Sequence, residues 1–216
     1  MDPDGRALLQ AARVPVDLVE LLAPRHTALV TQECQRGVIG DQAVLPELAR
    51  LAAPIVPAIA RLAAAARRAG VRVVHCTAVR RADGLGSNRN ARLFLATRRS
   101  PVPMLPGSPA AEVVPEIGVS DADLVVPRLH GLSPMHSTEL DPILRNLGVR
   151  TVVAVGVSVN LALTNLVFDA VNAAYQVVVP RDAVAGVPAA YVDAVLEHTL
   201  GLVATLTTTA DVLAAW

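Results

Sequence analysis

The sequence has few aromatic residues, few cysteines and no lysine. Aromatic residues make up 2% of its 216 residues, and all 19 basic residues are arginines, which we interpret as a composition bias without functional meaning. The hydrophobic share is 53% and the charged share 18%, which excludes a disordered chain. With so few aromatic residues, the core must be built from Ala, Val and Leu, which suits helices packed on a parallel sheet.

Neither sign of charge is in excess. The 19 basic and 19 acidic residues give a formal net charge of zero. This balance offers no electrostatic reason to expect nucleic acid or an anionic membrane as a partner. We therefore expect no nucleic acid and no membrane partner.

Two cysteines, Cys34 and Cys76, are too few for a disulfide framework. Neither belongs to a CxxC motif or to a Cys/His metal spacing, so we predict no metal site and no cofactor. The first residues are acidic where a signal peptide is basic, and the apolar stretches are interrupted before they reach membrane-spanning length. We expect a cytoplasmic protein.

Short β-branched runs alternate with longer Ala/Leu-rich helical stretches. This alternation predicts βαβ crossovers, and therefore a three-layer α/β/α fold with a parallel sheet of about six strands. We expect one domain over residues 1–216, with 1–25 as an N-terminal extension. The expected strands are 26–34, 71–79, 121–131, 150–156, 175–180 and 204–208.

Turn and capping signals set the expected helix ends. Residues 46–69 read as a helix that breaks near Pro54 and Pro57 and ends at Gly70. Thr138 and Asp141 have the spacing of a capping box that opens the next helix.

The segment GVSVNLA, residues 156–162, ends an apolar strand and opens an amphipathic helix. In a parallel sheet, such strand-to-helix turns hold the chemistry, because loops and helix N-termini converge there. We expect the binding site at this turn.

Several motifs in this order resemble the isochorismatase-like (cysteine hydrolase) superfamily. The resemblance covers about residues 26–185. The segments that carry it are LVTQECQRG, VVPRLHG, Thr138-Glu139-Leu140, GVSVNLALTNLVFDA and AAYQVVVPRDAVAG.

The resemblance implies a triad of an acid, a lysine and a nucleophilic cysteine, and this chain departs from it at all three positions. Glu33 stands for the usual aspartate, Arg128 for the lysine, and Ala162 for the cysteine. Leu129 is the alternative to Arg128, because the spacing to Thr138 is one residue longer than usual. The thioester route cannot run through Ala162, which has no nucleophilic atom.

Glu33 has two interpretations. It is an acid or base, as in the branch of the superfamily that protonates a vinyl ether without cysteine, or it is a structural partner of Arg128. An adjacent arginine stays charged and favours the ionised carboxylate, which argues against a general acid. Cys34 is a third alternative, as a relocated nucleophile. Strand alternation, however, points it away from the side that Glu33 serves, and both cysteines read as core residues.

Other polar residues are candidates to bind a substrate. The loop after the second strand carries two asparagines, and its GxG at residues 84–86 lacks the third glycine of a dinucleotide fingerprint. The resemblance also implies a cis peptide at Val157–Ser158 that aims backbone N–H groups at a substrate oxygen. His136 is a further candidate beside the pocket. The predicted substrate-binding residues are Gln35, His75, Asn88, Asn90, His130, Ser158, Val159, Asn160 and Ala162.

Two functions remain open at this point. The first is an enzyme of the hydrolase superfamily that acts on a small polar molecule without a cysteine nucleophile. The second is a catalytically silent member that binds a small molecule or serves as an assembly subunit. The resemblance implies a homo-oligomer, a dimer or a tetramer.

Overall fold

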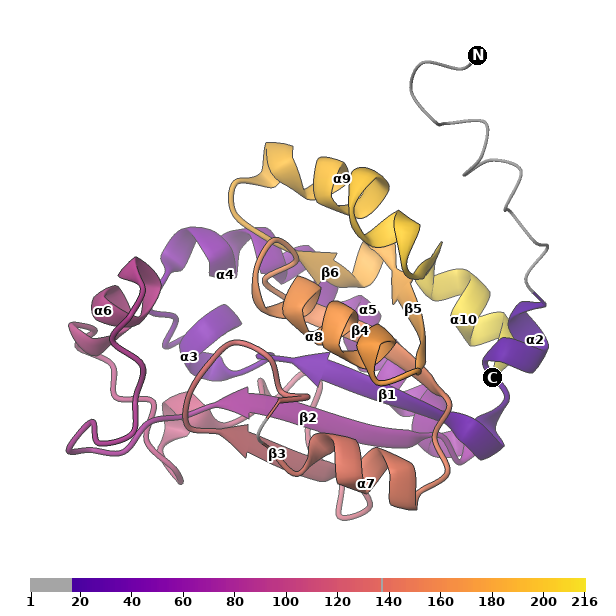
Figure 1. Cartoon of the computed structure of the whole chain (residues 1–216), viewed down its shortest axis with the longest axis horizontal. Helices are drawn as coiled ribbons and strands as arrows, with labels where there is room; N and C mark the ends of the chain where they lie inside the picture. The colour runs from indigo at the N-terminus through magenta and orange to yellow at the C-terminus, as the bar shows by residue number, and fades with distance from the viewer. Residues whose placement is uncertain (1–16, 137) are drawn as a thin grey trace.

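The computed structural model describes residues 17–136 and 138–216 and shows a parallel sheet with helices on both faces (Figure 1). The strand order is β3-β2-β1-β4-β5-β7, with β6 paired to β4, and every strand pair is parallel. The predicted three-layer α/β/α fold is confirmed. The strands are β1 (Thr27–Gln32), β2 (Arg72–Ala78), β3 (Leu124–Arg128), β4 (Thr151–Val157), β5 (Gln176–Pro180), β6 (Val184–Ala185) and β7 (Thr205–Thr207).

Helices pack against both faces of the sheet. The buried cluster on one face includes residues of α4, α5 and α10, and that on the other includes residues of α7, α8 and α9. The helices are α2 (Leu18–Leu21), α3 (Arg36–Ile39), α4 (Pro46–Ala52), α5 (Val56–Ala69), α6 (Arg92–Arg98), α7 (Leu140–Asn146), α8 (Ala162–Asn172), α9 (Ala189–His198) and α10 (Thr209–Ala215).

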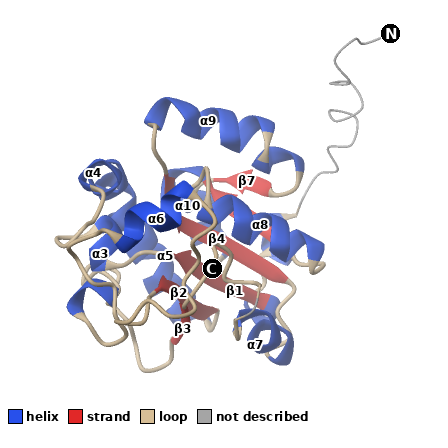
Figure 2. Cartoon of the chain, turned by 60° about the vertical axis from the view of Figure 1, so that its left-hand side comes forward, coloured by secondary structure: helices blue, strands red, loops and turns tan. Residues whose placement is uncertain are grey.

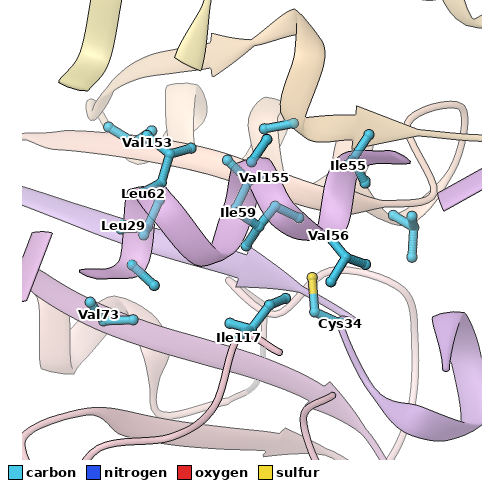
Figure 3. Packing of buried hydrophobic residues seen from close by; sticks show 14 of the residues in the cluster. Leu29, Cys34, Ile55, Val56, Ile59, Leu62, Val73, Ile117, Val153 and Val155 are labelled. Carbon is cyan, nitrogen blue, oxygen red and sulfur yellow. The ribbon is translucent and has the colours of Figure 1, made fainter. Parts of the chain in front are cut away.

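Helix α5 forms the centre of the first cluster. Ile59 and Leu62 point from it onto Leu29, Val73 and other residues of the strands beneath (Figure 3). Many of its remaining core positions are alanines, so the helix lies close to the sheet. The predicted break is present as a 3₁₀ turn at Ala53–Ile55, and Gly70 ends the helix with a φ of 77°.

The stretch Pro46–Ala69 is long and apolar enough to cross a membrane by length and composition alone. In this structure it is split by the 3₁₀ turn, and half of its most apolar 18-residue window is buried inside the fold. It therefore acts as the core helix layer over the first strands.

Two local predictions need correction. Thr138 does not open α7, because the N-cap is Glu139, which makes no side-chain capping bond. The Thr138 hydroxyl instead accepts a hydrogen bond from the Leu140 N–H at 3.1 Å and donates to Pro134 O. The two-residue strand β6, which pairs with the end of β4, was not predicted.

Candidate functional site

The carboxyl ends of β1, β3 and β4 meet at one edge of the sheet because all three strands run parallel. Gln32 ends β1 opposite Gly156 of β4, and Arg128 ends β3 opposite Ala78 of β2. Glu33 follows β1 directly, and Ala162 opens α8 shortly after β4. The topology thus places all three triad-like positions, Glu33, Arg128 and Ala162, at this edge.

Glu33 and Arg128 form a salt bridge there. The Arg128 Nη2 atom lies 2.5 Å from Glu33 Oε1, and the side chains are 4% and 16% exposed respectively. Glu33 adopts a φ of 52°, a conformation that a residue other than glycine rarely takes, and its N–H donates to Cys76 O at 2.9 Å. This left-handed turn directs the carboxylate toward the end of β3. Of the two candidates for the lysine position, Arg128 makes this contact with Glu33, whereas Leu129 is 46% exposed.

A hydrogen-bonded relay holds the arginine in place. Arg128 Nε donates to Gly131 O at 3.0 Å, and the Gly131 N–H donates to Asn88 Oδ1 at 2.7 Å. Asn88 also donates to Asn90 Oδ1 at 3.2 Å. Asn88 thereby fastens the loop after β2 to the loop after β3, and it positions the guanidinium through Gly131.

Gln32 is a site residue that the sequence analysis missed. It is fully buried, and its Nε2 donates to Glu33 Oε1 at 3.1 Å. Within the described residues, Gln32 Oε1 and Arg128 Nη1 are buried without a hydrogen-bond partner. A buried unpartnered polar atom costs about 1–3 kcal/mol, which marks both atoms as candidate ligand contacts. A glutamine at the end of a strand of threonine and aliphatic residues was the available signal.

Gln35 is buried and binds the protein's own backbone. Its Nε2 donates to Ala78 O at 3.0 Å and Ala111 O at 3.1 Å, and its Oε1 accepts from the Ala78 N–H at 2.7 Å. These bonds engage both ends of the amide. They fix the end of β2 beside Arg128.

His75 belongs to a buried network on the α5 face. Its Nδ1 lies 2.8 Å from Thr31 Oγ1, and its Nε2 lies 3.4 Å from Asp123 Oδ2. Asp123 in turn accepts from Arg67 Nη2 at 2.6 Å. Burial lowers the pKa of His75, although Asp123 opposes the shift. Burial raises the pKa of Asp123, but the hydrogen bonds from Arg67 and Ser120 outweigh it and leave that pKa below its usual value.

The turn before α8 is held by its own side chains. Val157–Ser158 is a cis peptide, as the resemblance implied. Ser158 Oγ donates to Asn160 Oδ1 at 2.5 Å, and Asn160 Nδ2 donates to Val187 O at 3.0 Å, while Val159 is fully buried. Ala162 is 3% exposed and is the first residue of α8, a position whose N–H has no acceptor within the helix.

The remaining predicted residues lie in exposed loops. Asn90, His130 and His136 are all exposed, and Asn90 accepts the hydrogen bond from Asn88.

Both cysteines are buried and poorly suited to nucleophilic attack. Cys34 packs in the cluster under α5 beside Val56 (Figure 3), and Cys76 packs in the cluster on the opposite face. Burial raises the pKa of each thiol to about 12, and the negative charge of Glu33 adds to the shift. The reactive thiolate is therefore strongly disfavoured.

In the described ranges, no three His, Cys, Asp or Glu side chains gather in a way that could hold a metal ion. Two cavities of about 340 and 270 Å³ lie elsewhere. The first is at the opposite end of the sheet, beside His26 and Arg150, and the second lies between Arg36 and Glu116. Neither is lined by Glu33, Arg128 or Ala162.

The parallel α/β/α fold, with an acid–base pair at the strand ends beside a cis-peptide turn, defines a protein of the isochorismatase-like class. The Isochorismatase domain matches residues 27–211, so the chain belongs to this family. No curated protein matches it.

Solved structures agree with this membership. A cysteine hydrolase from Pseudomonas syringae pv. phaseolicola is 27% identical with a TM-score of 0.78, and the match covers 94% of this chain and 95% of that one. An isochorismatase family protein from Burkholderia thailandensis is 26% identical with a TM-score of 0.73, covering 88% and 95%. N-carbamoylsarcosine amidase from Thermoplasma acidophilum is 25% identical with a TM-score of 0.68, covering 85% and 96%.

Proposed function

We propose that this chain is a hydrolase of the isochorismatase family that acts on a small polar molecule without a cysteine nucleophile. The observation that carries the proposal is the Glu33–Arg128 salt bridge at the carboxyl edge of the sheet. It keeps a carboxylate and a cation together at the triad-like positions although Ala162 supplies no thiol. The two remaining thiols are buried with raised pKa values, so neither replaces it.

Glu33 acts as a general base in this proposal. Arginine stays protonated, so the salt bridge favours the ionised carboxylate, which suits a base better than an acid. Gln32 and Arg128 both donate to Oε1, which leaves Oε2 without a hydrogen bond from the described residues. Oε2 is therefore the atom that takes a proton.

The reaction follows from this arrangement. Glu33 removes a proton from a water molecule, whose oxygen bonds to the substrate's carbonyl carbon. The backbone N–H groups at the start of α8, including that of Ala162, stabilise the oxyanion that forms. When the bond to the leaving group breaks, Glu33 returns the proton to that group.

The proposed binding residues divide into two sets. Gln35, His75 and Asn88 hold the frame of the site, because their polar atoms bond to other parts of the protein. Asn90 and His130 are exposed and free to contact a substrate at the mouth of the site. Ser158, Val159 and Asn160 shape the turn that presents the N–H groups.

One observation favours the second candidate, a catalytically silent family member. The carboxylate of Glu33 is neutralised by a buried arginine, and both described cavities lie away from it. A silent protein would keep this pair as a structural contact. It would bind a small molecule or serve as an assembly subunit.

Turnover by purified protein separates the candidates. The probes are a panel of small primary amides and N-carbamoyl compounds, tested with the wild type, Glu33→Gln and the exposed control Glu116→Gln. We expect Glu33→Gln to lower kcat/KM about 100-fold or more, as the loss of a general base does, and the control to leave it unchanged. Turnover that survives in Glu33→Gln contradicts the role of Glu33. Saturable binding without turnover supports the silent candidate.

We further propose that the protein is a cytoplasmic homo-oligomer that needs no cofactor and binds neither nucleic acid nor membrane. Leu161, the N-cap of α8, and Phe168, near the middle of that helix, are 42% and 39% exposed. Such apolar exposure suits a subunit contact. Light scattering after size-exclusion chromatography is expected to give the mass of a dimer or tetramer, and a monomer at micromolar concentration contradicts it.

A further inference from the structure

Positive charge is concentrated in one segment of this neutral chain. Residues 80–99 contain six arginines and one aspartate, which gives a net charge of +5, so the remainder of the chain carries −5. The six are Arg80, Arg81, Arg89, Arg92, Arg98 and Arg99.

The segment lies at the edge of the sheet that holds Glu33 and Arg128. It leaves the carboxyl end of β2 just beyond Ala78, which pairs with Arg128. It is held at this edge a second time by Asn88, whose Oδ1 accepts a hydrogen bond from the Gly131 N–H at 2.7 Å. Helix α6 lies beyond the ends of β1, β2 and β3 in Figure 1, and in front of the sheet in Figure 2. The segment and Glu33 therefore lie at the same edge of the sheet.

Most of its arginines are not neutralised. Arg81 pairs with Asp83 at 2.7 Å, but Arg89, Arg92, Arg98 and Arg99 form no salt bridge with residues 17–136 or 138–216. All four are exposed. The Glu33 carboxylate does not neutralise these four positive charges, because it already pairs with Arg128.

Helix α6 presents two of these arginines together. Arg92 and Arg99 lie seven residues apart, close to two turns, so they share the outer face with Leu95, which is 46% exposed. Leu93 and Phe94 are half-buried on the inner side. Guanidinium groups bind carboxylate and phosphate oxygens with paired hydrogen bonds.

We propose that residues 80–99 form an oxyanion-binding surface that attracts and holds an anionic group of the ligand that reaches the Glu33 site. The group is a phosphate or a carboxylate. The inference rests on the proposed function only for the identity of the site that the ligand enters. The positive potential also raises the association rate of anionic ligands, in a manner that salt suppresses.

Calorimetric titration of the full chain at low salt tests the proposal, with inorganic pyrophosphate and tricarballylate as probes. The test variant is Arg89→Gln/Arg92→Gln/Arg99→Gln. The matched control, Arg50→Gln/Arg61→Gln/Arg72→Gln, removes the same charge from exposed arginines elsewhere. We expect saturable binding of one or both probes by the wild type, an affinity about tenfold or more lower in the test variant, and little change in the control. The probe that binds identifies the anionic group.

Three results of this titration overturn the proposal. They are no saturable binding of either probe, equal loss in both triple variants, and binding that does not weaken in 200 mM salt, an ionic strength at which exposed charges about 10 Å apart are largely screened. Much tighter binding of single-stranded DNA than of pyrophosphate, lost in the test variant, would also overturn it, because the surface would then serve nucleic acid. Glu33→Gln is expected to keep oxyanion binding, so failure of the proposed hydrolysis and failure of this surface are distinguishable.

Discussion

Gly156 and Gln32 sit opposite one another on β4 and β1, so close that a Cβ atom added to Gly156 would overlap the Gln32 carbonyl oxygen. It would also lie 2.9 Å from Cys34 Sγ, and the φ of Gly156 is 107°. Only glycine fits here, and it lets the two central strands end side by side where Glu33 and the cis-peptide turn begin.

Gly156→Ala is therefore expected to destabilise the fold by about 3 kcal/mol or more, from strain and overpacking together. Gly107→Ala is the control, because Gly107 has a φ of 77° but open space around its missing Cβ, and it should cost about 1–2 kcal/mol. Urea unfolding measures both. Equal losses would show that steric overlap with β1 is not what selects glycine.

Removal of one partner of the Glu33–Arg128 salt bridge leaves a charge in a largely buried position. Arg128→Met is expected to lower the free energy of unfolding by about 3 kcal/mol. The double variant Glu33→Leu/Arg128→Met should recover most of that loss, because it leaves no unpaired charge. A double variant whose loss equals the sum of the two single losses would argue that the side chains are not energetically coupled.

The lowered pKa of the buried His75 is expected to reduce the free energy of unfolding under mildly acidic conditions. Because burial lowers its pKa, the unfolded chain binds a proton more readily than the folded one below about pH 6.5. The contribution is complete above that pH and is lost as pH falls toward the folded-state pKa. The Asp123 pKa is also lowered, so its contribution is lost only below about pH 4.

The free energy of unfolding, measured from pH 7 to 5, is expected to decline in the wild type and to decline less in His75→Gln. His130→Gln is the matched control, since His130 is exposed. An unchanged slope in His75→Gln would assign the pH dependence to other groups.

The thiols are expected to resist alkylation in the native protein. Both are about 1% exposed, and burial raises the pKa of each to about 12, so neither forms thiolate near neutral pH. Iodoacetamide should label no cysteine in native protein and both in 6 M guanidinium, as counted by mass spectrometry. Rapid native labelling of Cys34, with loss of turnover, would restore it as a nucleophile.

Substitution of the two loop asparagines is expected to have different effects on the free energy of unfolding. Asn88 binds the Gly131 N–H and so supports Arg128, whereas Asn90 is exposed. Asn88→Ala should cost about 1–2 kcal/mol of stability, and Asn90→Ala less than about 0.5 kcal/mol. Thermal unfolding of the two variants measures this difference, and equal values would remove Asn88 from the relay.

Much of the fold could be predicted because its signals are local. The β-branched runs became strands, with ends shifted by no more than three residues, and Pro54 and Gly70 marked the helix break and the helix end. The Thr138 capping box failed because the helix begins one residue later than expected, with Glu139 as its N-cap, while the Thr138 hydroxyl accepts from the Leu140 N–H. Strand β6 was missed because two residues carry too little pattern, and pairing with β4 alone defines it.

Roles in the site were harder to predict than positions. Residue types pointed to Glu33, Arg128, Gln35 and Asn88. The sequence could not show that Gln35 and Asn88 each bind a backbone group 43 residues away. Gln32 was missed because strand alternation alone assigns neighbouring residues to opposite faces. The left-handed backbone at Glu33 breaks that alternation and brings both side chains together.

The sequence by itself determined the layered fold, the family and the loss of the thiol at residue 162, since these depend on residue type and on the order of short apolar patterns. The sequence offered a Glu33–Arg128 pair and buried cysteines only as interpretations. The tertiary structure decided between the alternatives, because it brings Glu33 to Arg128, 95 residues away, and encloses both thiols in the core. Contacts of that kind depend on strand order and register, which arise from the packing of the whole sheet and not from neighbouring residues.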